Sequence, residues 1–98
     1  MLKRRRISGS NTVKVSFILS ADDSRLPASV VGDFNDWDPE ADPMVRRSNG
    51  TFSAVVPLIA DATYLFRYHS EDGTWFNDEG ADGFEPNAHG STDCLIEL

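Results

Sequence analysis

The chain is a series of short runs of β-branched and aromatic residues, and each run ends at Gly, Pro, Asp or Asn. None of these runs places apolar residues at the 3.6-residue period of an amphipathic helix. In the first run, Val13, Val15 and Phe17 alternate with Lys14 and Ser16, which is typical of a strand with one buried and one solvated face. Runs of this length and spacing predict an all-β sandwich of short antiparallel strands.

Further strands are expected along the rest of the chain, at residues 29–32, 44–47, 51–58, 63–69, 74–76 and 95–98. The pair Asn49-Gly50 favours a tight hairpin turn before the strand that starts at Thr51. The apolar run at 29–32 is continuous, so we expect it to be covered on both faces. A long polar loop is expected at 77–90.

Length and charge limit what the chain can be. Its 98 residues suffice for one domain, and its single cysteine, Cys94, cannot form an internal disulfide, so packing alone must hold the fold. We expect a disordered basic tail over 1–12, where Lys3–Arg6 are followed by polar residues, and a β-sandwich domain over 13–98. The net charge of −7 disfavours nucleic acid, and no apolar run is long enough for export or membrane insertion. A cytoplasmic protein that contacts no membrane is therefore expected.

Acidic residues crowd two expected loops, 33–38 and 72–85, so catalysis and metal binding need consideration. A glycosidase holds two carboxylates across a deep cleft, which a sandwich of this size does not provide. A calcium loop needs an oxygen ligand and then Gly where this chain has Trp37 and Asp38. His69 and His89 have no partner at zinc-ligand spacing. We therefore expect no enzyme activity, no metal and no cofactor.

The two tryptophans occupy turn-rich segments. Trp37 lies among Asp36, Asp38 and Pro39, and Trp75 follows a Gly-containing turn. An indole offers a flat apolar surface with an electron-rich face, onto which the C–H face of a pyranose ring can stack. The alternative is that each indole caps one end of the sandwich core.

Two segments carry a family resemblance. Residues 32–37, Gly-Asp-Phe-Asn-Asp-Trp, resemble the G-x-F-N-x-W signature of the family 48 carbohydrate-binding modules, which are isoamylase-type early-set domains. Residues 64–68 and 72–75 resemble the later strand and turn of that family, Y-x-[YF]-[RK]-[FY] followed by D-G-x-W. The resemblance covers roughly residues 13–98 and extends to the glycogen-binding domain of the AMP-activated kinase β subunit.

The resemblance implies an immunoglobulin-like early-set β-sandwich that binds α-glucan without catalysis, as a free-standing module for glycogen, starch or maltooligosaccharide. It implies that Trp37 and Trp75 stack on glucose units and that Arg67 contacts sugar hydroxyls. In the last loop the family's aliphatic, hydroxyl and asparagine positions correspond to His89, Ser91 and Asp93 in this chain. His89 thus replaces an aliphatic side chain, and Asp93 lacks the amide donor.

A second function stays open at this point. In multidomain members of the family the same sandwich also packs against catalytic domains. The chain would then be a protein–protein interaction or regulatory module of a glycogen-metabolising enzyme system, with a protein partner. In that case the two indoles would pack inward or against protein.

Overall fold

The computed structural model describes all residues, 1–98, and contains strands and loops without any helix. The nine strands are β1 (Leu2–Arg6), β2 (Thr12–Ser20), β3 (Ala28–Gly32), β4 (Val45–Arg46), β5 (Thr51–Ile59), β6 (Thr63–Ser70), β7 (Trp75–Phe76), β8 (Gly83–Pro86) and β9 (Thr92–Glu97). Since it has no helix, the structure has no helical segment that could span a bilayer.

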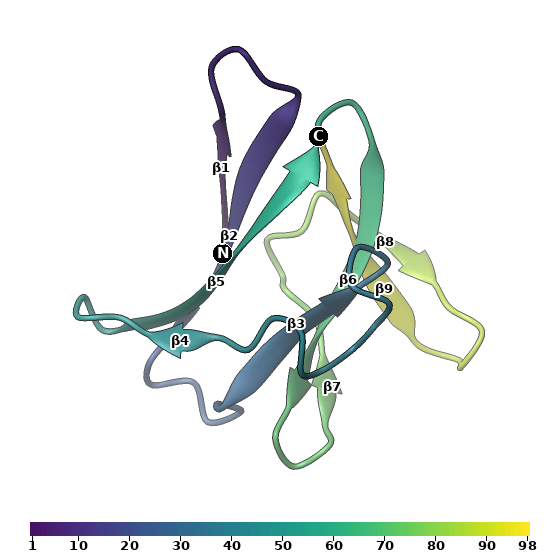
Figure 1. Ribbon diagram of the computed structural model, residues 1–98. Helices are drawn as coiled ribbons and strands as arrows, with labels where there is room; N and C mark the ends of the chain where they lie inside the picture. The colour runs from purple at the N-terminus through teal and green to yellow at the C-terminus, as the bar shows by residue number, and fades with distance from the viewer.

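The strands form two antiparallel sheets that face each other (Figure 1). The first sheet has the order β1-β2-β5-β4, and the second has the order β3-β6-β9-β8, with β7 alongside β6. The strand pattern predicted an all-β sandwich and the family resemblance implied the immunoglobulin-like early-set form, and both predictions are confirmed.

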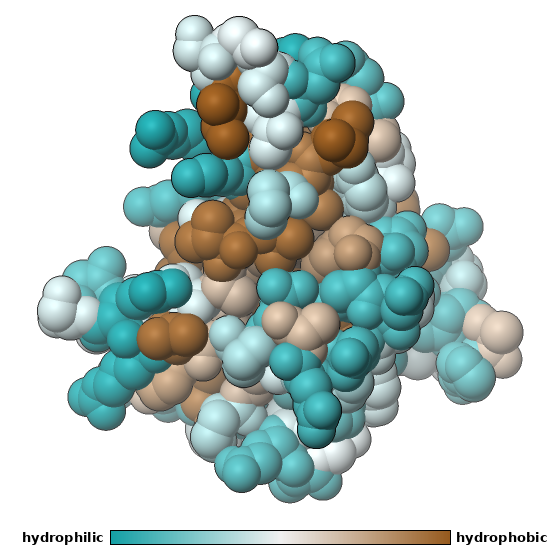
Figure 2. Space-filling model, in the orientation of Figure 1, coloured by the Kyte–Doolittle hydropathy of each residue, from teal (hydrophilic) through white to brown (hydrophobic).

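The core lies between the two sheets and is built mainly by side chains that alternate along β2 and β6. Val13, Val15 and Phe17 of β2 are buried, as are Phe66 and Tyr68 of β6. The rings of Phe17 and Phe66 meet edge to face with centroids 5.0 Å apart, which joins the two sheets at their centre. In the space-filling view, apolar side chains gather in the middle of the molecule between the sheets, and hydrophilic ones surround them (Figure 2).

Two local predictions are confirmed. Val30 and Val31 are neighbours on β3 and both are fully buried, so this strand is covered on both faces. The expected hairpin joins β4 and β5: the Arg47 N–H donates to the Thr51 carbonyl over 2.8 Å, and Gly50 adopts a left-handed φ of 79°, as the last residue of a three-residue hairpin loop commonly does.

The prediction of disorder over 1–12 was wrong for Leu2–Arg6, which form β1 and pair with β2 along its free edge. Leu2 packs against the core, and Arg4 makes an ion pair with Asp82 of the opposite sheet's loop. The sequence does not predict this strand, because its basic residues show no apolar alternation. The strand forms through backbone hydrogen bonds, whose groups every residue but proline carries. The expected polar loop at 77–90 likewise contains a short strand, β8.

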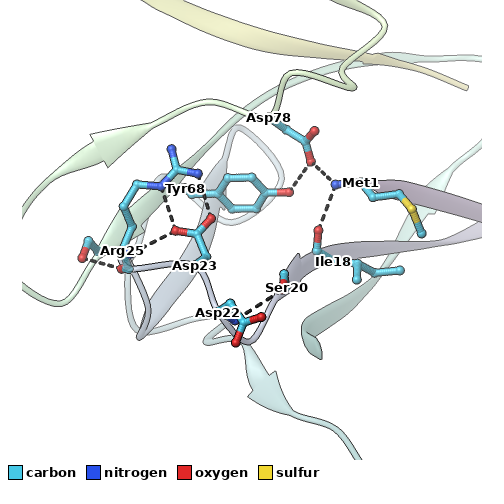
Figure 3. Close-up of polar contacts among 9 residues, drawn as sticks. Met1, Ile18, Ser20, Asp22, Asp23, Arg25, Tyr68 and Asp78 are labelled. Atoms are coloured by element: carbon cyan, nitrogen blue, oxygen red, sulfur yellow. Dashed lines mark hydrogen bonds and ion pairs between the residues drawn. The ribbon is translucent and has the colours of Figure 1, made fainter. Parts of the chain in front are cut away.

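A buried polar cluster closes one side of the core (Figure 3). The hydroxyl of Tyr68 donates to Oδ2 of Asp78 over 2.7 Å, and the Met1 amino group donates to the same oxygen over 2.8 Å. Burial alone would raise the pKa of Asp78, but these donors and the Gly80 N–H outweigh it and hold that pKa below its usual range. Burial also raises the pKa of Tyr68, so its hydroxyl stays a donor.

Candidate functional site

The outer face of the second sheet carries an open groove of about 630 Å³. Along β6, Phe66 and Tyr68 point into the core, so the intervening residues Leu65 and Arg67 face outward. The loop after β3 and the loop between β8 and β9 close the sides of the groove. Its lining consists of Trp37, Leu65, Arg67, Trp75, Asn87, Ala88, His89 and Asp93.

The loop after β3 is fixed by Gly32 and Asn35. A Cβ on Gly32 would lie 2.4 Å from the carbonyl oxygen of Leu65 and 2.6 Å from the Phe34 ring, so only glycine fits there. The Asn35 side chain accepts from the Gly32 N–H over 3.0 Å and donates to the Val30 carbonyl over 3.0 Å. The turn that leaves the strand is therefore held by side-chain hydrogen bonds as well as by packing.

Trp37 is presented by an unusual backbone conformation. Asp36 and Trp37 both adopt left-handed φ values, 57° and 58°, which cost energy for residues with a Cβ. The Trp37 N–H donates to the Gly32 carbonyl over 2.9 Å, which holds the turn in this shape. As a result the indole is half-buried, lines the groove and lies outside the hydrophobic core.

Trp75 lines the same groove from β7, where it pairs with His69 of β6. Its side chain is 41% exposed, and its ring meets the ring of His69 at a tilt of 69° with centroids 4.6 Å apart. The Arg67 guanidinium carbon lies 5.9 Å from the Trp75 ring centroid. Contacts from two neighbours on β6 thus limit how the indole can turn.

Arg67 is oriented by Asn77. The Arg67 Nε donates to Asn77 Oδ1 over 2.8 Å, and Asn77 Nδ2 donates to the carbonyl and hydroxyl oxygens of Thr92 at 3.0 and 3.1 Å. Arg67 has no ion-pair partner, so the donors of its terminal nitrogens are free to bind a ligand in the groove.

The Asn87 side chain holds the loop between β8 and β9, which forms the side of the groove away from Trp37. Its Oδ1 accepts from the N–H groups of His89 at 2.9 Å and of Ser91 at 3.1 Å. Its Nδ2 donates to Asp93 Oδ1 over 3.0 Å. The amide therefore shapes the loop and holds the Asp93 carboxylate at the groove.

The structure brings together most of the residues expected to contact sugar. Trp37, Arg67, Trp75, His89 and Asp93 line one groove, although they come from separate segments of the chain. Ser91 is exposed and does not line it.

Sequence reasoning missed three lining residues, Leu65, Asn87 and Ala88. The alternation on β6 could have found Leu65, because the position two before Arg67 must face the same way. For Asn87 and Ala88 no local pattern predicts which side chains of a loop turn inward.

The groove has the chemistry of a binding surface. Two indoles and Leu65 supply apolar area, and Arg67, Asn87 and Asp93 supply donors and acceptors. Asp93 is the one carboxylate of the lining, so the groove does not hold the acid pair that glycoside hydrolysis uses. No group of three His, Cys, Asp or Glu side chains in the structure is placed to hold a metal ion.

Fold and groove together define a small all-β binding module with an open aromatic surface. The family model of carbohydrate-binding module 48, the isoamylase N-terminal domain, matches residues 10–88. The chain belongs to this family of carbohydrate-binding modules.

The chain is similar to 1,4-alpha-glucan branching enzymes. The chain is 31% identical over 87 residues to the 1,4-alpha-glucan branching enzyme GlgB of Synechococcus elongatus, covering 88% of this chain and 11% of the enzyme. It is 43% identical over 61 residues to that of Novosphingobium aromaticivorans, covering 60% of this chain and 8% of the enzyme. It is 41% identical over 46 residues to GlgB 2 of Xanthomonas campestris pv. campestris, covering 46% of this chain and 6% of the enzyme. The chain thus spans about a tenth or less of the curated relatives it matches.

Proposed function

We propose that this module binds α-glucan without catalysis, as glycogen, starch or maltooligosaccharide, in the groove between Trp37 and the Asn87–Asp93 wall. The observation that carries the proposal is that two indoles, one from the loop after β3 and one from β7, open onto one groove together with Arg67. Membership of the carbohydrate-binding family supports the same ligand class.

The groove suits linked glucose rings in its shape and in its polarity. Each indole can take the apolar C–H face of one ring, while the ring's hydroxyls point toward polar neighbours. The free nitrogens of Arg67 would donate to these hydroxyls, and the carboxylate of Asp93 would accept from them. An open groove rather than a closed cleft fits a polymer that continues beyond the site in both directions.

The expected affinity is modest. Two aromatic stacks contribute about 0.5–1.5 kcal/mol each beyond area burial, and a few hydrogen bonds contribute about as much each. After ordering costs, a net of about −4 to −7 kcal/mol corresponds to a dissociation constant between roughly 1 mM and 10 μM. Such a site suits a ligand with many repeated chains, where several contacts to one polymer particle raise the apparent affinity.

The relatives suggest the setting in which such binding is used. They are named as 1,4-alpha-glucan branching enzymes, so their substrate class agrees with the ligand proposed for this groove. We propose that this chain supplies polymer binding, either free-standing or beside a catalytic domain that makes or remodels the same glucan. A reducing, cytoplasmic setting is supported by the single free thiol, Cys94.

Tryptophan fluorescence during titration with maltoheptaose or β-cyclodextrin tests the proposal, because both indoles of the chain line the groove. We expect a saturable change in emission, with calorimetry giving the same dissociation constant in the range above. No change in emission and no heat at millimolar ligand would exclude α-glucan binding here.

A matched pair of variants distinguishes binding in the groove from binding to any exposed aromatic ring. Trp75→Ala should reduce affinity about tenfold or more. Phe84→Ala, which removes another exposed aromatic ring that does not line the groove, should leave the affinity unchanged. Equal losses in both variants would argue against the groove as the binding site.

A further inference from the structure

Charge is divided unevenly between the two sheets. The four strands of the first sheet, β1, β2, β5 and β4, contain no Asp or Glu, so all 16 acidic residues of the chain lie elsewhere. The same strands carry six of the nine Lys and Arg residues, and Arg47 follows directly after β4. A protein with a net charge of −7 therefore presents one cationic sheet.

Strand register places three of these cations on the outer face. Arg4 and Arg6 of β1 pair with the buried Val15 and Val13 and share their inward side, so Lys3 and Arg5 point outward. Lys14 lies opposite Arg5 and joins them.

The fourth cation is fixed to the sheet surface. Arg47 Nε donates to the Ser53 hydroxyl over 2.8 Å, and this serine is on β5 directly opposite Ile18 of β2. Lys3, Arg5, Lys14 and Arg47 make no ion pair within the protein, so the charge of this face is not neutralised.

The same face exposes aliphatic side chains. Val45, Val55 and Ile59 are 50%, 47% and 60% exposed, and they rank among the most exposed large apolar residues of the molecule. A shallow groove of about 390 Å³ runs across these strands, with Lys3, Ser16, Ile18, Arg47, Ser53 and Val55 in its lining. By register, Ile18, Val55 and Val45 lie on β2, β5 and β4, and Lys3, Arg5 and Lys14 lie beside them on β1 and β2, so this face combines apolar area with unneutralised charge, as protein interfaces do.

We propose that this outer face of the first sheet docks a protein partner whose contact surface carries aliphatic or aromatic side chains next to a row of carboxylates. The unpaired cations would meet carboxylates, and Ile18, Val55 and Val45 would be covered by apolar side chains. This inference goes beyond glucan binding and does not depend on it.

Other occupants fit the face less well. A symmetric dimer through this sheet would bury the cations of both copies against strands that contain no Asp or Glu, which is unfavourable. A nucleic-acid backbone or anionic lipid headgroups would pair with the cations but would leave the short aliphatic side chains on a flat sheet without apolar contact.

The two binding faces lie on opposite sides of the sandwich. The glucan groove uses outward residues of β6 and its neighbours, whereas the docking face uses outward residues of β1, β2 and β5. A partner could therefore be held on one side while polymer is bound on the other.

The test uses synthetic polypeptides as probes of partner chemistry. By calorimetry on the intact chain, we expect a random copolymer of glutamate and tyrosine to bind, and polyglutamate of the same length to bind at least severalfold more weakly. Raising the salt concentration should weaken both. No binding of the copolymer, or equal binding of both polymers, would overturn the proposal.

Two sets of variants locate the contact. The double change Lys3→Glu, Lys14→Glu should reduce copolymer affinity about tenfold or more, and Val55→Ser should reduce it severalfold. Arg6→Glu with Arg46→Glu, cations outside this face, is the matched control and should have a clearly smaller effect. Equal losses in test and control variants, with unchanged melting temperatures, would show that only net charge matters.

Two further arms test the other occupants. Phosphatidylserine vesicles and a DNA duplex are titrated under the same conditions as the copolymer. We expect each to bind more weakly than the copolymer, with no loss from Val55→Ser. Tighter binding to either than to the copolymer would overturn the assignment to a protein partner.

Discussion

Arg67 Nε and Asn77 Oδ1 are joined by a 2.8 Å hydrogen bond that fixes the guanidinium over the outer face of β6. Asn77 is itself tied to the backbone and side chain of Thr92, so the orientation of Arg67 depends on a residue that does not line the groove. This relationship makes Asn77 a positioning residue of the proposed glucan site.

Asn77→Ala should weaken maltoheptaose binding by about three- to tenfold, because Arg67 loses its orienting acceptor while keeping its charge. Binding calorimetry measures the loss, and Asn49→Ala in the distant hairpin is the control. If Arg67→Ala weakens binding but Asn77→Ala does not, then Arg67 needs no orientation by its neighbour.

In the loop between β8 and β9, substitution of two nearby polar residues should change glucan affinity to different extents. His89 lines the groove and Ser91 does not, although both were expected to contact sugar. His89→Ala should therefore reduce affinity severalfold, and Ser91→Ala should leave it unchanged. A larger loss from Ser91→Ala than from His89→Ala, measured by calorimetry, would contradict the placement of this loop.

Gly32 should tolerate no side chain. Gly32→Ala places a Cβ 2.4 Å from the Leu65 carbonyl oxygen, which the backbone of β6 cannot easily avoid. We expect a loss of about 3 kcal/mol or more in the free energy of unfolding, or a failure to fold. Gly50→Ala, in open space but at a left-handed φ, should cost only about 1–2 kcal/mol by the same denaturant titration.

The sequence predicts those parts of the fold whose cause lies within a few neighbouring residues. The alternation of Val13, Val15 and Phe17 predicts β2 and its buried face, because side-chain direction follows from strand geometry alone. By contrast, β1 has no such alternation in its run of basic residues, and it forms because β2 offers an unpaired backbone edge. That edge is a property of the assembled sheet and is not encoded in Leu2–Arg6.

The candidate site also has one part that the sequence predicts and another that depends on the assembled fold. Trp37 and Trp75 stand out because large aromatics in turn-rich segments are exposed more often than those within strands. Their meeting across one groove depends on the left-handed turn at Asp36 and Trp37 and on the pairing of β7 with β6, which bring together residues far apart in the chain. The role of Asn77 is equally hidden, since an asparagine in a loop shows no sign of the side chain that it will orient.

Asp78 should make the free energy of unfolding depend on pH in the acid range. The pKa of Asp78 is lower in the folded protein than in the unfolded chain, so its contribution is complete above the unfolded value of about 4. That contribution is lost as the pH falls through the lower, folded value. Asp78→Asn should cost roughly 1–3 kcal/mol near neutral pH.

Denaturant titrations between neutral and acid pH check this contribution. The difference in free energy of unfolding between wild type and Asp78→Asn should narrow as the pH falls. A difference that stays constant across this range would show that the charge of Asp78 does not stabilise the fold.

Cys94 should be unreactive in the folded protein. It is fully buried, and burial raises the pKa of its thiol to about 11, so neither access nor thiolate is available near neutral pH. A disulfide reagent that releases a coloured thiolate should label the native protein very slowly and the denatured protein at once. Rapid labelling under native conditions would mean that the sandwich opens locally around β9.

The most direct test of glucan binding follows the two indole N–H signals of the protein by two-dimensional NMR during titration with maltoheptaose. The chain has two tryptophans, so the spectrum reports each half of the groove separately. We predict that both signals shift together and give one dissociation constant between roughly 10 μM and 1 mM. Two signals that stay in place at millimolar maltoheptaose would contradict the account.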